Sequence, residues 1–208
     1  MSRRMFLAGS GVLLCGISVG MLQVASFGFD PFTCFVTAID HFGHLSFAVG
    51  YPIITAVMLI FFWIVNRHLL GIATILNLFL IGTCAQVTKA LSLSLGLDSF
   101  TSRALFMVSG LVLMCLASAL YYTADLGVSG YDAVALTLAQ RFRQIPFRWW
   151  RISCDLICVL VGFAGQASVG IGTVITALFM GPLITFFQKT VSEPLLNQKK
   201  PVADKSAD

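Results

Sequence analysis

The chain is poor in charge: 13 Lys and Arg plus 9 Asp and Glu make up only 11% of its 208 residues. Soluble domains carry about 25% charged residues, whereas 58% of this chain is hydrophobic. No polar stretch is long enough to form a soluble domain. The net charge of +4 does not indicate nucleic-acid binding, because the Lys and Arg flank hydrophobic segments, where membrane topology places them.

The residue sets of catalytic and metal sites are also missing. The sequence has no Ser-His-Asp set and no nucleotide-binding loop, and residues 40–44 (DHFGH) offer too few ligands for a zinc site. Its six cysteines lie in apolar runs away from clustered histidines, where cysteine acts as a small hydrophobic residue. We therefore expect a protein that is not an enzyme and that has no cofactor and no metal site.

Apolar runs are what the sequence has instead. A membrane-spanning helix needs about 20 mostly apolar residues. Candidate runs occur at 5–21, 51–65, 69–87, 104–122, 152–164 and 169–187. They predict an all-α polytopic membrane protein in contact with the lipid bilayer. Arg3-Arg4 before the first run resembles a signal peptide, but a matching segment lies in mid-chain at 103–124, so we expect the first helix to be retained.

A shift of 99 residues aligns the first half of the chain with the second without gaps. Shared hydrophobicity alone does not explain the match, because glycines and polar residues coincide. The coinciding positions are Arg4 and Arg103, Ser10-Gly11 and Ser109-Gly110, Gly28 and Gly127, and the Gly-Ile-x-Thr runs at 71–74 and 170–173. They predict two tandem membrane repeats, 1–98 and 99–191, followed by a polar, disordered cytoplasmic tail at 192–208.

Each repeat is expected to hold three long helices and one short segment, Gly28–Phe42 or Gly127–Arg141. Such a segment spans about 22 Å as a helix, less than a hydrocarbon core of ~30 Å, so it is either re-entrant or barely spanning. If both segments cross, 12 of the 13 Lys and Arg lie inside; if both are re-entrant, 11 do. Either count puts both termini in the cytoplasm. Eight crossings make the halves parallel and six make them inverted, and the match of Arg4 with Arg103 favours the parallel arrangement.

Three segments carry a family resemblance: LGVSGYDAVALTLAQ (126–140), RWWRISCD (148–155) and GIGTVITALFMGPLITFF (170–187). With the weaker copy in the first half, they resemble the YczE/YyaS/YitT-type bacterial integral membrane proteins. The resemblance covers 5–190 and implies a duplicated protein of the bacterial plasma (inner) membrane, from a family suspected of transport. The first half departs from the pattern, because Thr33 stands opposite Asp132 and Ala56 opposite Asp155, so a symmetric site would be uneven.

Two acids are candidates for binding a substrate or an ion. Asp132, beside Tyr131, and Asp30 stand near the starts of the two short segments. An acid within the membrane is costly unless it faces a cavity or a partner. The alternative is that both acids are helix caps or first-turn residues, which the helix dipole favours. Asp30 precedes Pro31 as an N-cap precedes a proline at the first helical position.

Other polar residues lie on the longer helices. Thr74 and Thr173 follow glycines at the start of the last helix of each repeat, and Asn77 lies one turn further in. They serve either tight helix packing or the lining of a site. Arg151 and Asp155 are four residues apart and are expected to pair on one helix face. That pair is either a structural salt bridge or a gate that opens during transport.

These features together predict a secondary transporter or permease for an unidentified small molecule or ion. A membrane-embedded substrate-binding subunit that works with a separate energising complex is one alternative, and a non-transporting scaffold is another. The chain has no ATP-binding motif, so it is not itself a pump. GISVG (16–20) has a small-xxx-small spacing that suits helix contact within the bundle or in a homodimer.

Overall fold

The computed structural model describes residues 2–94 and 99–197, and all regular secondary structure within them is helical. The helices are α1 (Ser2–Ala25), α2 (Pro31–Gly43), α3 (Phe47–Val65), α4 (Ile72–Ser94), α5 (Phe100–Ala124), α6 (Gly130–Arg141), α7 (Phe147–Ala164), α8 (Ile171–Phe187) and α9 (Glu193–Asn197), with a 3₁₀ turn at Arg67–Leu69 and a π-helical turn at Gln188–Ser192. The all-α prediction is confirmed for this part of the chain, and α2 and α6 are the two short helices that it expected.

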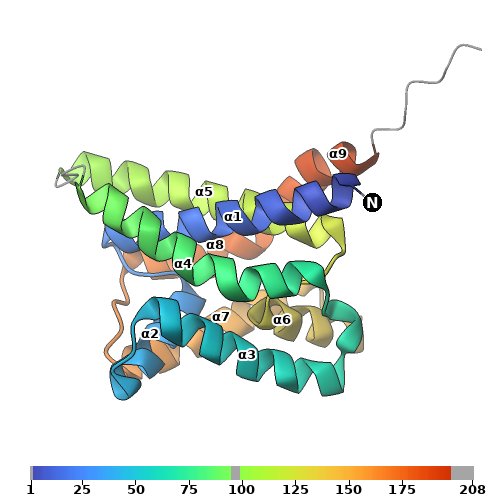
Figure 1. Cartoon of the computed structure of the whole chain (residues 1–208), viewed down its shortest axis with the longest axis horizontal. Helices are drawn as coiled ribbons and strands as arrows, with labels where there is room; N and C mark the ends of the chain where they lie inside the picture. The colour runs from blue at the N-terminus through green and yellow to red at the C-terminus, as the bar shows by residue number, and fades with distance from the viewer. Residues whose placement is uncertain (1, 95–98, 198–208) are drawn as a thin grey trace, which may run out of the picture.

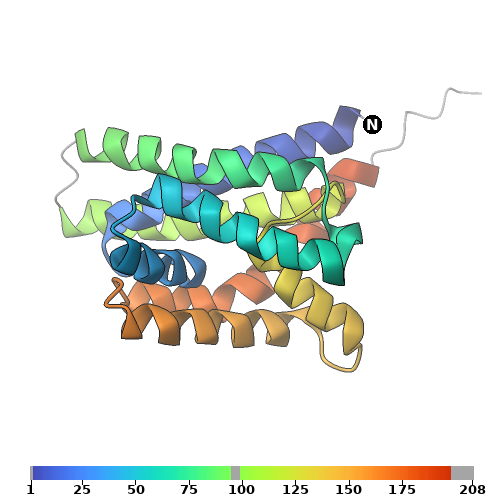
Figure 2. The same cartoon turned by 60° about the horizontal axis from the view of Figure 1, so that its bottom comes forward.

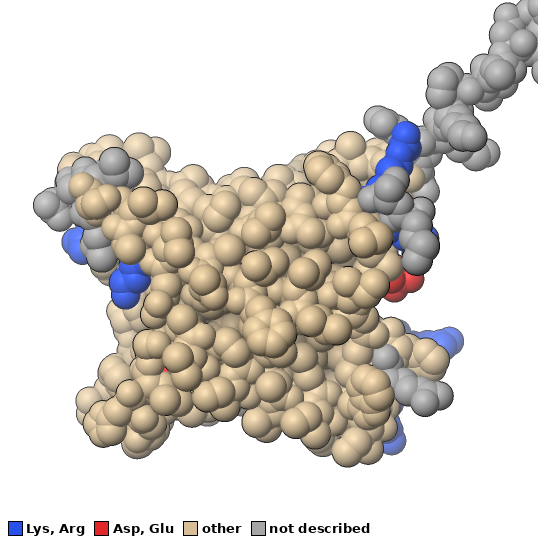
Figure 3. Space-filling model, viewed as in Figure 1, with Lys and Arg blue, Asp and Glu red and all other residues tan. Residues whose placement is uncertain are grey.

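The surface has the pattern of a membrane protein. Five stretches of described helix are long and apolar enough to cross a bilayer: 3–25, 47–65, 72–92, 100–124 and 171–196. Long helices run along the long axis of the molecule (Figure 1), and Lys and Arg gather at its two ends, with a nearly uncharged face between them (Figure 3). The chain is an integral membrane protein whose apolar helices contact lipid.

Helices α1 and α5 share the most extensive contact in the bundle and run in opposite directions (Figures 1 and 2). Phe27, just after α1, meets Phe100 at the start of α5, with 5.5 Å between ring centroids. At the other end, Arg4 lies 3.9 Å from Asp125, just after α5. Parallel halves would need α1 and α5 to point the same way, so the arrangement favoured by the match of Arg4 with Arg103 is wrong.

The chain turns back into the molecule before each short helix. Figure 1 shows α2 ending at the same end of the molecule as α1, and α6 ending at the opposite end, as α5 does. The turn before α2 is pinned to the start of α8, and the turn before α6 is pinned to the start of α4. The bonds are Phe29 N to Ser168 O (3.0 Å), Gly172 N to Phe27 O (2.8 Å), Val128 N to Leu69 O (3.0 Å) and Ala73 N to Leu126 O (3.0 Å).

Gly28 and Gly127 make these turns possible. Their φ angles are +110° and +111°, a region that residues with a side chain rarely adopt. At Gly127, a Cβ would also collide with Gly71 and with the hydroxyl of Thr74, because the turn packs directly on the start of α4. Both the backbone conformation and the close approach therefore require glycine here.

The GISVG motif mediates contact inside the bundle. A Cβ on Gly16 would lie 2.6 Å from the Cβ of Cys84, and one on Gly20 would lie 2.6 Å from the carbonyl oxygen of Ala85. Both neighbours belong to α4, so α1 and α4 approach closely along this stripe of small residues. The motif is therefore occupied within one chain and does not support a homodimer.

The helical structure extends beyond the expected end of the second repeat. Ser192 is buried within the π-helical turn, and α9 continues to Asn197. The predicted tail at 192–208 therefore begins with helix. Residues 198–208 lie outside the described residues. Figure 1 places α9 beside the N-terminus, at one end of the molecule.

We predict that Gly127→Ala destabilises the protein by more than about 1 kcal/mol, because alanine is strained at this φ and collides with the start of α4. Gly9→Ala is the matched control, since Gly9 lies within α1 and a Cβ there meets nothing within 4 Å. Melting of the detergent-purified variants, followed by the loss of the monodisperse peak, measures the difference. Equal melting temperatures would show that the turn tolerates a side chain.

Candidate functional site

A small cavity of about 40 Å³ lies where the two short helices begin. A cavity of this size holds only a few water molecules. Its wall combines apolar residues with side chains that carry a thiol, hydroxyl, carboxyl or guanidinium group. The latter are Cys15, Asp30, Tyr51, Ser118, Tyr121, Ser129, Tyr131, Asp132 and Arg151. Ile81 of α4 and Met180 of α8 also belong to the wall, so the cavity joins α1 and the helices from α3 through α8 to the residue that precedes α2.

Both short helices direct their N-terminal ends at this cavity. Asp30 is the N-cap of α2, and its Oδ2 accepts a hydrogen bond of 3.1 Å from the backbone N–H of Thr33. Ser129 is the N-cap of α6, and its hydroxyl accepts the N–H of Asp132 at 3.1 Å. The cap interpretation is thus confirmed for Asp30, whereas Asp132 is a first-turn residue. The partial positive charges of two helix ends converge on one buried space.

Arg151 on α7 is the cation of the site. Its guanidinium forms an ion pair with Asp132 and a second one with Asp155, whose Oδ1 lies 3.4 Å from Nε. The same guanidinium lies over the ring of Tyr131, 4.4 Å from its centroid. The side chain is only 5% exposed. The predicted pair with Asp155 is present, but the closer partner is Asp132, which belongs to another helix.

Asp132 ties three helices together. Its Oδ2 accepts hydrogen bonds from the hydroxyls of Tyr121 on α5 and Ser129, the latter at 2.7 Å, while its Oδ1 binds Arg151. The hydroxyl of Tyr131 donates to Asp155. Every oxygen of the Asp132 carboxyl is therefore occupied by a donor from the protein.

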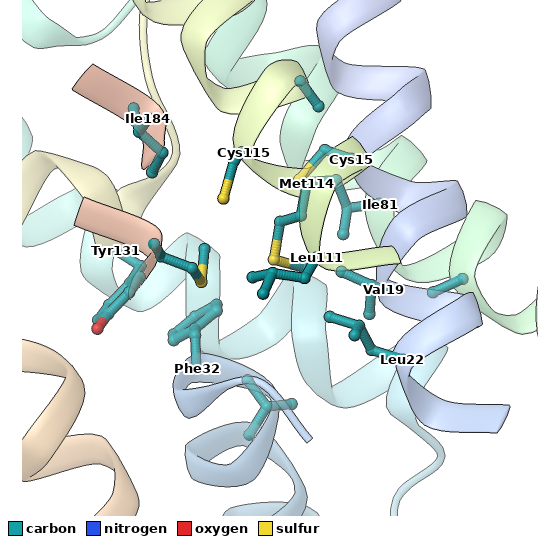
Figure 4. Packing of buried hydrophobic residues seen from close by; sticks show 14 of the residues in the cluster. Cys15, Val19, Leu22, Phe32, Ile81, Leu111, Met114, Cys115, Tyr131 and Ile184 are labelled. Carbon is teal, nitrogen blue, oxygen red and sulfur yellow. The ribbon is translucent and has the colours of Figure 1, made fainter. Parts of the chain in front are cut away.

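Stacked aromatic rings form one wall beside the ion pairs. Phe32 of α2 stacks on Tyr131 of α6, with 4.7 Å between centroids, and meets Tyr51 of α3 edge-on at 5.6 Å. Figure 4 shows Phe32 and Tyr131 next to each other, to the left of the labelled side chains of α1 and α5. Tyr51 donates to the amide oxygen of Asn77 at 3.1 Å. Asn77 therefore orients Tyr51 and does not line the cavity itself.

Thr74 and Thr173 also lie outside the cavity wall. The hydroxyl of Thr74 accepts the N–H of Gly71 at 3.1 Å and donates to the carbonyl of Val128 at 2.8 Å. Thr173 accepts the N–H of Gly170 at 3.2 Å. Thr74 therefore holds the turn before α6, and Thr173 closes the first turn of α8; both support the packing of the helices and neither lines the central cavity.

A second, larger hollow of about 340 Å³ opens near the ends of α5 and α6. We call it the vestibule; its wall includes His68, Tyr122, Asp125, Gln140, Phe147 and Gln188. Tyr122 is adjacent to Tyr121, with 4.9 Å between their centroids, and Tyr121 lines the central cavity. Neighbouring tyrosines of α5 therefore each line one of the two spaces. Gln188 begins the π-helical turn, a distortion that is frequent at functional sites.

Several residues of the site were not expected from the sequence, notably Tyr51, Tyr121 and Cys15. Tyrosine in an apolar helix is a weak signal, because its hydroxyl usually finds a partner when it is buried. The positions themselves carry no mark that separates Tyr121, which binds Asp132, from Tyr122, which faces the vestibule.

The fold and the site define a helical integral membrane protein with a buried ion cluster at the start of two half-length helices. The chain belongs to the family of unknown function DUF6198, whose model matches residues 2–189.

An uncharacterized protein of Haemophilus influenzae is 30% identical over 183 residues, which cover 86% of this chain and 80% of the relative. The uncharacterized membrane protein YczE of Bacillus subtilis is 25% identical over 193 residues, covering 92% and 87%. The expected resemblance to YczE-type proteins is confirmed. No solved structure matches the chain.

We predict that Asp132→Asn lowers the stability of the purified protein by about 1–3 kcal/mol, because it removes the closer carboxylate from a buried guanidinium. Asp125→Asn is the control, since the carboxyl of Asp125 is 85% exposed and exposed ion pairs contribute little. Thermal unfolding in detergent measures both variants. If the two melt alike, the Asp132–Arg151 pair does not stabilise the bundle.

Proposed function

We propose that this protein is a secondary transporter that moves a small molecule or ion through the central cavity. The observation that carries the proposal is the meeting of two half-length helices, by their N-terminal ends, at a buried cavity that contains Asp30, Asp132 and Arg151. Interrupted helices of this kind build the binding sites of many carriers near the middle of the membrane. Ionisable groups within a membrane mark such pathways, because their burial is costly.

We further infer that the two halves are inverted repeats. Three observations support this. Helices α1 and α5 run in opposite directions, and the two short helices point to opposite ends of the molecule. Each hydrogen bond at the turn before α2 also has a counterpart at the turn before α6, in which both residues are offset by 99 positions. In this arrangement the five apolar stretches named above and α7 cross the membrane, which makes six crossings, while α2 and α6 are re-entrant. Inverted repeats allow a carrier to expose one site to either side by rocking one half against the other.

The charge distribution gives the orientation that we propose. With re-entrant α2 and α6, and with the buried Arg151 left aside, seven Lys and Arg of the described residues fall on the side that holds the N-terminus and only two, Lys89 and Arg103, on the other; the first side is then the cytoplasm. The vestibule opens on the same side, because its Asp125 pairs with Arg4 near the N-terminus. In this proposal, the structure is assigned to a carrier state that has a small central cavity and is hollowed toward the cytoplasm of the bacterial inner membrane.

A transport cycle must enlarge the central cavity. Pockets for small organic molecules measure roughly 300–1,000 Å³, against about 40 Å³ here. The vestibule has the required size, and movement of Tyr121 and Tyr122 would join the two spaces. Tyr122 packs edge-on against Phe147 at 6.0 Å, so these rings form the cytoplasmic gate that we propose. The Arg151 pairs lie behind that gate.

The native Cys15 tests this proposal without knowledge of the substrate. Cys15 lines the cavity and is 8% exposed, whereas Cys115 is fully buried and does not line it. A membrane-impermeant cationic methanethiosulfonate is applied to right-side-out and to inside-out vesicles, and the modified cysteines are located by mass spectrometry. We expect Cys15 to react from both sides, since a carrier opens its site alternately, and Cys115 to remain unmodified.

The same measurement separates the alternatives. A binding subunit with a fixed opening would be modified at Cys15 from one side only. A scaffold would leave Cys15 as unreactive as Cys115 on both sides, which would refute the transport proposal. Replacement of Tyr122 by alanine, which removes the ring of the proposed gate, should raise the rate of Cys15 modification from the cytoplasmic side and leave the opposite side unchanged.

A further inference from the structure

The carboxyl groups around the central cavity outnumber their cations. Asp30 and Asp132 line the cavity together with one guanidinium, that of Arg151, and Asp155, which is not part of the wall, pairs with the same guanidinium as Asp132. Two helix N-termini add about half a positive charge each. If all three carboxyls were ionised, about one negative charge would remain uncompensated in a space that excludes most water.

Asp30 is the carboxyl of these three that has no ion pair. Asp155 also has a buried oxygen without a hydrogen-bond partner, Oδ2, but its Oδ1 lies 3.4 Å from Nε of Arg151. The side chain of Asp30 is buried, only 6% exposed, and its Oδ2 is occupied by the N–H of Thr33. Its Oδ1 is buried and has no hydrogen-bond partner among the described residues. Asp132, by contrast, has donors on both oxygens. An ionised carboxylate in the position of Asp30 is much more costly to bury than a neutral carboxylic acid.

We propose that Asp30 carries an exchangeable proton and is the coupling site for protons in this transporter. The proton sits on the carboxyl group while the cavity is closed. When the cavity opens, Asp30–COOH gives Asp30–COO⁻ and a proton that passes to the entering water, which then solvates the charge. The coupling role of Asp30 rests on the transport function proposed above. That Asp30 holds a proton can be tested separately.

None of the other titratable groups near Asp30 competes with it as the proton carrier. They are Cys15 from α1, Tyr51 from α3, Tyr121 from α5, Tyr131 and Asp132 from α6, and Arg151 and Asp155 from α7. Cysteine and tyrosine side chains ordinarily titrate above about pH 8, so they are neutral under physiological conditions. Asp132 and Asp155 both pair with the guanidinium that lies between them, whereas Asp30 has no cation as a partner.

A metal cation fits this site poorly. The guanidinium of Arg151 lines the same cavity and repels a second positive charge. Calcium requires about 6–8 oxygen ligands, and the described residues contain no group of three or more His, Cys, Asp or Glu able to hold a metal ion. A proton needs only the free oxygen of Asp30, so it is the cation that the geometry favours.

Infrared spectroscopy of the full-length protein in lipid at neutral pH tests the inference. We expect a C=O stretching band of a protonated carboxylic acid that shifts in D₂O. The band should be lost in Asp30→Asn and retained in Asp155→Asn. Its absence from the wild type, its persistence in Asp30→Asn or its loss in Asp155→Asn would each overturn the assignment.

The thermal stability of the same variants gives an independent readout. Asparagine is as good an N-cap as aspartate and resembles the neutral acid, so Asp30→Asn should melt at the wild-type temperature. Asp30→Ala removes the cap and should melt lower, by the equivalent of about 1 kcal/mol. A large loss in Asp30→Asn would show that the site needs the charged form and would contradict the inference.

Failure of this inference differs from failure of the transport proposal. If Cys15 is modified from both sides but no carboxylic acid band depends on Asp30, the protein is a carrier that does not store its proton there. If the band is present and Cys15 is unreactive, Asp30 holds a proton in a protein that does not transport.

Discussion

The buried guanidinium of Arg151 is the interaction on which the centre of the molecule depends. It binds Asp132 of α6 and Asp155 of its own helix, and it lies over the ring of Tyr131. A buried ion is tolerated only when its partners and hydrogen bonds are complete. The cluster therefore forces α6 and α7 into one relative position, and the bond from Tyr121 to Asp132 extends the constraint to α5.

The geometry of the turns before α2 and α6 makes that cluster possible. Gly28 and Gly127 reverse the chain in a conformation that excludes side chains, and backbone hydrogen bonds to the starts of α8 and α4 hold the reversed segments, with a further bond from the hydroxyl of Thr74 to Val128. The short helices consequently begin inside the protein, where their unpaired N–H groups and partial positive charge are available. Acids near these starts are then stabilised where lipid alone would exclude them. The glycine turns therefore place the helix starts where the buried acids need them, next to the Arg151 cluster.

A closed centre beside a vestibule is typical of a molecule with more than one state. The small cavity is walled by polar and aromatic groups, of which the carboxyl of Asp30 has one free oxygen and the others are largely engaged. Tyr121 lines this cavity, and the adjacent Tyr122 lines a hollow that is several times larger. In the transport cycle that we propose, moving these rings would exchange aromatic contacts for water, at a cost that a bound solute or a released proton would offset. The half-length helices are the elements best placed to move, because each spans only part of the bundle.

The sequence by itself determined that this is a helical membrane protein with two short, glycine-preceded segments and with acids at their starts. Hydropathy, glycine position and proline position act locally, so they can be read along the chain. Only the tertiary structure decided that α1 and α5 are antiparallel, that Asp132 is the closer partner of Arg151, and that Thr74, Thr173 and Asn77 support the site from outside. The sequence suggested the pair of Arg151 with Asp155 because those residues are four apart on one helix. The partners from α5 and α6 depend on how separate helices pack, and spacing along the chain does not record that packing.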